Sequence, residues 1–228
     1  MGSDIIAIAL TVILGYLIGS VNISIILTKL MGKQDIRELG SGNAGTTNMT
    51  RNYGKTLGVL TMVGDILKGA FAVALGLILF TLIAGGGNNV LAKYLGGFAA
   101  VTGHVFPVFF GFRGGKGIAT IGGAVIALNY KVAILLFLVM IILTLVTRYV
   151  SLSSIISASL ITPSFLVYEL IWGTAKTAEN FLTVGILCFA MSALVIFMHR
   201  ENMVRLHNKT ERRIGDSKEA LKEKTKIV

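Results

Sequence analysis

Long apolar runs separated by short polar segments are the first pattern in this chain. The runs cover residues 5–28, 57–83, 90–110, 118–128, 132–147, 152–172 and 181–198. A helix needs about 20 apolar residues to cross the hydrocarbon core of a bilayer. The pattern therefore predicts an all-α, polytopic membrane protein, a bundle of seven transmembrane helices with short re-entrant or interfacial segments.

The fourth run, residues 118–128, is too short to span a bilayer alone. The polar break that follows, at Asn129 and Lys131, is typical of a tight turn outside the cytoplasm. Residues 118–147 could instead form one long tilted or bent element. Five or six spans therefore stay open as alternatives to seven.

The charge of the chain fixes the expected orientation. Charged residues make up only 14% of the sequence and the net charge is +10. Because the apolar runs exclude a soluble nucleic-acid-binding protein, the basic excess indicates cytoplasmic loops. With the N-terminus outside and the C-terminus cytoplasmic, only Lys93, Lys131 and Lys176 lie outside, and Lys68 lies within the second span. The expected organisation is one membrane domain over residues 1–205 and a basic cytoplasmic tail over residues 206–228.

The first unusual polar segment covers residues 35–55. Its glycine spacing matches a dinucleotide-binding pattern by letter only, because it follows a membrane span and not a β-strand. Glycines nevertheless let successive backbone N–H groups point at one anion, and an arginine adds a bidentate fork. An ordinary polar loop rich in turn formers is the alternative. The candidate anion-binding residues are Ser41, Gly42, Asn43, Thr47, Asn48 and Arg51.

The second segment covers residues 103–120. Pro107 should end the preceding helix near His104. Arg113, Gly114, Gly115 and Lys116 then place two cations on a flexible backbone before the next apolar helix, and helix N-termini attract phosphate. A basic turn that only holds the loop inside would explain the cations, but not the glycines.

The third segment begins at His199, where the last apolar run ends. On a continuing helix His199 and Asn202 share a face, whereas Arg200 and Glu201 point elsewhere. His199 is either an ordinary interfacial residue or a candidate proton acceptor or phosphate donor. The three histidines lack the close spacing of metal ligands, so we expect no metal.

Asp65 and Lys68 lie inside the second apolar run at i, i+3. Charges within a membrane are costly and suggest function, although the two could simply neutralise each other. We expect Lys68 to face the site, Asp65 to hold it, and His104 to lie near the same end.

All three polar segments fall on the cytoplasmic side of the seven-span arrangement. They supply many cations and backbone donors and few acids, so they should bind more than one phosphate-sized anion beside the hydrocarbon. An enzyme that joins a phosphorylated polar substrate to a fatty acyl chain fits these constraints. The residues alone do not name the substrates.

Three motifs in order resemble those of the bacterial acyl-phosphate:glycerol-3-phosphate acyltransferase (PlsY) family. They are GSGNAGTTN from residue 40, GHVFPVFFGFRGGKGIAT from residue 103 and HRENMVRL from residue 199. The resemblance covers nearly the whole chain. Ala44 stands where the family often has proline, and Arg113 stands where it often has lysine, a planar fork in place of a point charge.

The resemblance implies a seven-helix enzyme in the bacterial cell (inner) membrane, with its active site facing the cytoplasm. It would transfer an acyl group from acyl-phosphate to the primary hydroxyl of glycerol 3-phosphate, giving lysophosphatidic acid and phosphate for phospholipid biosynthesis. Membrane lipid is the other expected partner; we expect no cofactor and no nucleic acid, and the oligomeric state stays open. The His-x4-Asp signature of other glycerolipid acyltransferases is absent from the sequence.

The motifs also imply roles for the matching residues. Ser41, Gly42 and Asn43 would cradle a phosphate or the developing oxyanion. Arg51, Arg113 and Lys116 would hold the two phosphates with Lys68 in support. His199 and Asn202 would orient glycerol 3-phosphate, whose proton would pass to His199 or to the donor's own phosphate. Direct attack without an acyl-enzyme is expected, and an anion or lipid-phosphate transporter or a membrane phosphatase is the rival interpretation.

Overall fold

The computed structural model describes residues 2–86, 88–173 and 177–216, and every regular element in those ranges is a helix. The predicted all-α class is thus confirmed. The elements are α1 (Gly2–Ser20), α2 (Ile23–Leu30), η1 (Ile36–Glu38), α3 (Thr46–Tyr53), α4 (Lys55–Ile83), α5 (Asn89–Val105), η2 (Val108–Phe110), α6 (Ile118–Leu128), α7 (Tyr130–Thr147), α8 (Val150–Trp172), α9 (Ala178–Met198) and α10 (Arg200–His207).

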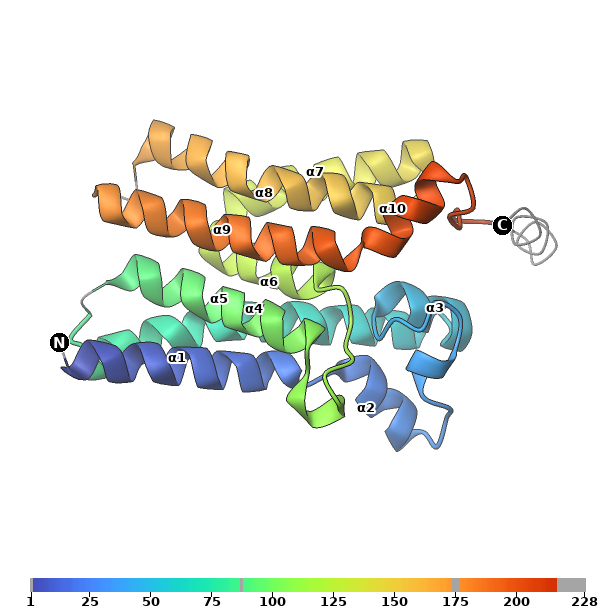
Figure 1. Ribbon diagram of the computed structural model, residues 1–228, viewed down its shortest axis with the longest axis horizontal. Helices are drawn as coiled ribbons and strands as arrows, with labels where there is room; N and C mark the ends of the chain where they lie inside the picture. Colours follow the sequence, from blue (N-terminus) through green and yellow to red (C-terminus); the bar gives the residue numbers. More distant parts are fainter. Residues whose placement is uncertain (1, 87, 174–176, 217–228) are drawn as a thin grey trace.

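The long helices form two groups that lie side by side (Figure 1). Helices α1, α4, α5 and α6 pack together in one group, and α8 packs against both α7 and α9 in the other. Contacts of α5 with α9 and of α6 with α7 join the groups. The short elements α2, α3 and α10 gather at the end of the bundle opposite the N-terminus (Figure 1). The fold therefore concentrates its irregular polar segments at one end.

Small residues let the helices of the first group approach closely. A methyl group added at Gly69 of α4 would collide with the Thr120 carbonyl of α6, and one added at Gly123 would collide with the Ile66 carbonyl. Such small-residue contacts are typical of membrane helices, because lipid-facing surfaces gain nothing by hydrophobic burial against each other.

Five described helices are long and apolar enough to cross a membrane: α1, α4, α7, α8 and α9. The other two predicted spans correspond to α5, with 17 residues, and α6, with 11. At about 1.5 Å per residue, these two cover roughly 26 and 17 Å, less than the hydrocarbon thickness of about 30 Å. A single extended residue, Asn129, separates α6 from α7 and caps α7. The alternative of one continuous element over residues 118–147 is therefore wrong.

The first predicted span, residues 5–28, is divided in the structure. Helix α1 ends at Ser20 and α2 begins at Ile23. The buried Asn22 side chain caps α2 by accepting from the Ile25 N–H at 3.2 Å. A polar residue that satisfies a helix end makes the break favourable even inside an apolar run.

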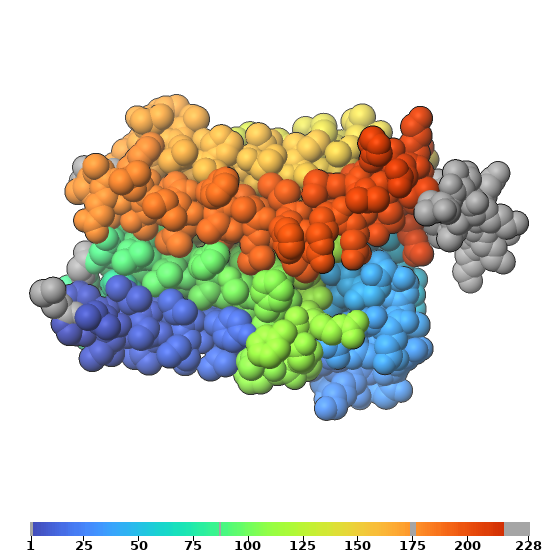
Figure 2. All heavy atoms as spheres, in the orientation of Figure 1, coloured from blue at the N-terminus to red at the C-terminus, as the bar shows by residue number. Residues whose placement is uncertain are grey.

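Outward faces of the bundle are apolar. In α7 only Val132 and Leu136 are buried, and the rest of the helix is partly or fully exposed. Figure 2 shows the α5–α6 connection projecting from the surface beside the segment that contains α2. This distribution fits a protein whose long helices face lipid.

Candidate functional site

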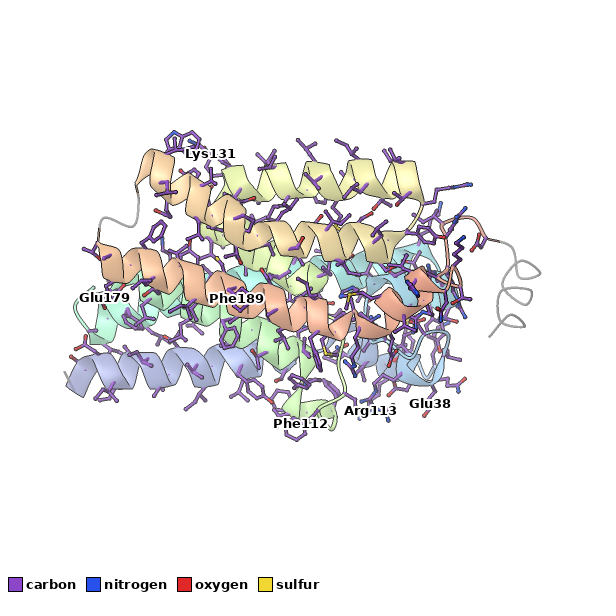
Figure 3. The ribbon with its side chains drawn as sticks, turned by 45° about the horizontal axis from the view of Figure 1, so that its top comes forward. Glu38, Phe112, Arg113, Lys131, Glu179 and Phe189 are labelled. Atoms are coloured by element: carbon purple, nitrogen blue, oxygen red, sulfur yellow. The ribbon has the colours of Figure 1, made fainter. Side chains whose placement is uncertain are left out.

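A cavity of about 880 Å³ lies where the two helix groups meet. Its apolar part is lined by side chains of α4, α6, α7 and α8, among them Ile66, Ile126, Ile134 and Phe137. Its polar part is lined by the 40–51 segment, Lys116, and residues at and beyond the end of α9. Figure 3 shows many side-chain nitrogen atoms at the end of the bundle that carries α3 and α10.

The loop before α3 is folded by Asn48. The Asn48 amide nitrogen donates to the carbonyls of Ile36 and Leu39 at 3.0 and 2.9 Å, and its Oδ1 accepts from the Ser41 N–H at 3.1 Å. The Gly42 N–H donates to the Leu39 carbonyl at 3.0 Å. Two N–H groups of the predicted glycine nest are thus used within the loop, and Asn48 acts as its internal brace.

The start of α3 offers free donors in place of the nest. Gly45 precedes α3 without a side-chain cap, and Thr46 and Thr47 of its first turn line the cavity. Uncapped N–H groups and the helix dipole favour an anion at this position. Arg51, one turn further along α3, also lines the cavity. Partial burial and the neighbouring guanidinium of Arg212 lower the pKa of Arg51 from its usual value.

The loop between α5 and α6 returns along the end of α5 toward the cavity. Helix α5 ends at Val105, two residues before Pro107, as predicted. Gly114 and Gly115 donate their N–H groups to the carbonyls of Val105 and His104 at 3.2 Å. A methyl group on Gly114 would strike the His104 carbonyl, and one on Gly115 would strike the His104 ring. These glycines therefore serve close packing, and their N–H groups are not available to phosphate.

The two cations of this loop, Arg113 and Lys116, lie in different surroundings. Lys116 lines the cavity, and its Nζ contacts the Asn202 amide oxygen. Arg113 is exposed and lies on the outer side of the molecule beside Phe112 (Figure 3). Burial, helped by the nearby Arg205 cation, lowers the pKa of Lys116 to about 8. Lys116 is therefore a cation near neutral pH that any added negative charge in the cavity would stabilise.

His199 directly follows α9 and lines the same cavity. Its Nδ1 lies 2.8 Å from the Val195 carbonyl. Because a carbonyl only accepts, Nδ1 carries the hydrogen and Nε2 is left as an acceptor. Burial, reinforced by the Lys116 charge, lowers the pKa of His199 to about 4. Near neutral pH the ring is thus a neutral hydrogen-bond acceptor, while Arg200 and Glu201 are exposed, as the helical spacing predicted.

Glu211 gathers the polar residues around Asn202. Its Oε1 accepts from Asn202 Nδ2 and Ser151 Oγ, both at 2.8 Å, and its Oε2 pairs with Arg205 Nε at 2.7 Å. Burial alone would raise the pKa of Glu211, but hydrogen bonds from Arg205, Asn202 and Ser151 outweigh it and lower the pKa. The carboxylate therefore stays charged although only 6% of the residue is exposed.

The charges inside α4 are arranged differently from the expectation. Lys68 Nζ pairs with Asp65 at 2.8 Å and donates to the Val21 carbonyl at 2.8 Å, so it braces the break between α1 and α2. Asp65 and His104 line the cavity, whereas Lys68 does not. His104 Nδ1 lies 3.5 Å from the Asp65 carboxylate.

Nine of the fourteen predicted site residues line this one cavity, and they come from all three polar segments. They are Ser41, Asn43, Thr47, Asn48, Arg51, His104, Lys116, His199 and Asn202; Gly42, Lys68, Arg113, Gly114 and Gly115 do not line it.

The cavity is also lined by Ser151, Glu211 and Arg212, which sequence reasoning missed. Arg205, a residue of the third motif to which no role was assigned, lines it too. The predicted domain boundary after residue 205 falls inside α10, and residues 217–228 of the predicted tail lie outside the described residues.

Comparisons with known proteins point to one family. The sequence model of the glycerol-3-phosphate acyltransferase family matches residues 9–209. The chain is 39% identical to a glycerol-3-phosphate acyltransferase of Clostridioides difficile (strain 630), over 91% of this chain and 95% of that protein. It is 41% identical to the Bradyrhizobium sp. (strain BTAi1) glycerol-3-phosphate acyltransferase, over 90% and 94% of the two chains.

Two solved structures share the fold. The crystal structure of PlsY (YgiH), an integral membrane glycerol 3-phosphate acyltransferase, in its glycerol 3-phosphate form aligns with a TM-score of 0.76 and 38% identity, covering 91% of this chain and 96% of that one. Its lysophosphatidic acid form aligns with a TM-score of 0.74 and 37% identity, covering 90% and 94%. The resemblance carried by the three motifs is confirmed, and the chain belongs to the glycerol-3-phosphate acyltransferase family.

Proposed function

We propose that this protein transfers a fatty acyl group from acyl-phosphate to the primary hydroxyl of glycerol 3-phosphate. The hydroxyl oxygen attacks the acyl carbon, the bond from that carbon to the phosphate oxygen breaks, and lysophosphatidic acid and phosphate form. The observation that carries the proposal is a single cavity that joins a cationic, donor-rich end to a long apolar end. The phosphorylated acceptor needs the polar end. The acyl-phosphate donor needs both ends, the polar one for its phosphate and the apolar one for its acyl chain.

The apolar end suits the acyl chain. It is lined by Met62 and Ile66 of α4 and by Phe137 and Met140 of α7. At roughly 25 cal/mol per Å² of apolar area removed from water, burying an acyl chain here would supply much of the donor's binding energy.

The polar end suits two phosphates. Arg51, Lys116, Arg205 and Arg212 line it together with the free start of α3. Charge-assisted hydrogen bonds from arginine and lysine to phosphate are among the stronger polar contacts in proteins. Ser41 and Asn43 lie beside them and can donate to a phosphate or to the developing oxyanion.

The state of His199 supports transfer of the hydroxyl proton to a phosphate oxygen. With its pKa lowered to about 4, the ring holds a proton poorly at neutral pH, although Nε2 can accept a hydrogen bond from the attacking hydroxyl. A phosphomonoester has its second pKa near 6, so its dianion takes a proton more readily. His199 would then orient the hydroxyl while the phosphate of the acyl donor serves as the base.

We place the protein in a bacterial inner membrane as a seven-helix bundle, in which α5 and α6 are the two shorter members. The positive-inside rule puts the N-terminus outside and the site at the cytoplasmic face. Helix α5 is shorter than the hydrocarbon core, so the polar ends of the neighbouring helices would surround its ends. Helix α6 would cross only part of the bilayer. A cysteine introduced at exposed Lys29 should be labelled by an impermeant reagent in inside-out vesicles only.

A phosphate-release assay with purified protein in vesicles tests the reaction. Release from acyl-phosphate that requires glycerol 3-phosphate, with matching formation of lysophosphatidic acid, supports the transferase. Release with water alone would identify a phosphatase, and uptake of labelled glycerol 3-phosphate without turnover would identify a transporter.

A further inference from the structure

Glu211 occupies an unusual place for an acidic residue. It lies beyond the last membrane helix and beyond the three motifs, yet it is only 6% exposed and lines a cavity otherwise rich in cations. A carboxylate repels phosphate, so direct contact with either substrate would weaken binding. Its role must therefore run through the residues that it contacts.

Those contacts determine the direction of the Asn202 amide. A side-chain amide has a donor end and an acceptor end, and a carboxylate can only accept. Because Glu211 Oε1 accepts from Asn202 Nδ2 at 2.8 Å, the Asn202 oxygen is turned toward Lys116 Nζ. This series of contacts, from Glu211 through Asn202 to Lys116, thus fixes both a polar group and a cation of the site.

The carboxylate is itself held on three sides. Ser151 of α8 donates to it at 2.8 Å, and Arg205 of α10 pairs with it at 2.7 Å. The Thr210 and Glu211 N–H groups both donate to the Arg205 carbonyl, at 2.8 and 3.1 Å, and so return the chain toward the cavity directly after α10. A group anchored in this way has little freedom to follow a rotating amide.

We propose that Glu211 is a positioning residue that orients Asn202, and through it Lys116, for the phosphate-bearing substrates. The inference rests on the proposed acyl transfer. It assigns a role to the segment after α10, whose contribution local sequence patterns do not reveal.

A double-mutant cycle with Glu211→Gln and Asn202→Ala tests this role, because only residues that act through each other give non-additive effects. Glutamine keeps the shape but presents donor and acceptor ends, so Asn202 loses its fixed direction. Glu211→Gln should lower kcat/KM for glycerol 3-phosphate by about tenfold to a hundredfold, the range for a hydrogen bond to a charged group. In the Asn202→Ala background the same change should cost less than about threefold. Equal losses in both backgrounds, or unchanged kinetics of folded Glu211→Gln, would overturn the proposal.

Controls separate positioning from folding. Glu38→Gln makes the same chemical change at an exposed carboxylate that does not line the cavity, and it should leave kcat/KM unchanged. If Glu211→Gln fails to fold, Glu211→Asp keeps the charge and enters the same cycle. Failure of both to fold would identify Glu211 as a residue of folding and overturn the proposal.

Calorimetric binding of glycerol 3-phosphate carries the same cycle without turnover. A wild-type protein that binds glycerol 3-phosphate but releases no phosphate would contradict the proposed acyl transfer alone. The binding cycle would then still decide whether Glu211 acts through Asn202.

Discussion

The pH dependence of turnover gives a direct test of Lys116. Burial lowers the pKa of Lys116 to about 8 in the free protein. Since the ammonium form binds phosphate and the neutral amine does not, activity should be lost as the pH rises through about 8. The His199 ring, with its pKa lowered to about 4, should contribute no change between about pH 6 and 9.

The size of the effect follows from the titration. With a pKa of about 8, Lys116 is roughly nine-tenths protonated at pH 7 and roughly one-tenth protonated at pH 9. We expect kcat/KM for glycerol 3-phosphate, measured at low acyl-phosphate, to fall about tenfold over that interval, because this ratio then reports the free enzyme. Bound phosphate favours the ammonium form. At saturating substrate, kcat should therefore stay level to a higher pH.

The measurement uses initial rates of phosphate release at low glycerol 3-phosphate, corrected for hydrolysis of acyl-phosphate without protein. Lys116→Arg is the matched variant, because guanidinium does not titrate in this range. Its rate should be lower, since the fork differs in shape, but it should lack the alkaline decline. An unchanged midpoint in Lys116→Arg, or a wild-type midpoint near 10, would refute the reasoning.

Three further outcomes are expected. His199→Ala should raise KM for glycerol 3-phosphate more than it lowers kcat in steady-state kinetics, because the ring binds and does not take the proton; the opposite split would make it the base. Arg212→Gln should raise KM by about tenfold and Arg113→Gln by much less, since only Arg212 lines the cavity. Gly69→Val should destabilise the protein by about 1–3 kcal/mol in thermal melts through its clash with α6, whereas Gly122→Ala, which meets no atom within 4 Å, should not.

Apolar length predicted the helices well and their interruptions poorly. The run over residues 118–128 coincides with α6, because its ends carry strong signals, a glycine before it and Asn129 after it. The break at Asn22 was missed because one polar residue hardly changes the hydropathy of a long run. Its cap and the Lys68 contact to Val21, which reaches across 47 positions, stabilise that break.

The candidate site shows the same division between local and distant information. Residues with distinctive chemistry, such as Ser41, Lys116 and His199, could be recognised from composition and motif, and the fold brings them to one cavity. The sequence does not show which N–H groups remain free. Those of Gly114 and Gly115 donate to carbonyls at the end of α5, a contact that only the fold reveals. Glu211 was missed because its partner Ser151 lies 60 positions away. Its polar sequence context is also that of an ordinary solvent-exposed tail.

The charge balance of the cavity bears on which phosphate Lys116 contacts. Among the described lining residues, Asp65 pairs with Lys68 and Glu211 with Arg205, so no lining carboxylate directly pairs with Lys116. During acyl transfer the charge of the acceptor's phosphate stays constant, whereas negative charge grows on the leaving phosphate to the extent that its bond to carbon breaks ahead of proton transfer from the hydroxyl. A cation contributes to kcat only where charge changes on the way to the transition state.

Burial has lowered the proton affinity of Lys116, and growing negative charge beside it would stabilise its ammonium form. We therefore expect Lys116 to lie beside the leaving phosphate. Lys116→Gln should then lower kcat more strongly than Arg212→Gln does, whereas Arg212→Gln should act chiefly on KM for glycerol 3-phosphate. Steady-state kinetics of both variants over both substrates would decide this. A loss confined to KM for glycerol 3-phosphate in Lys116→Gln would place Lys116 beside the acceptor.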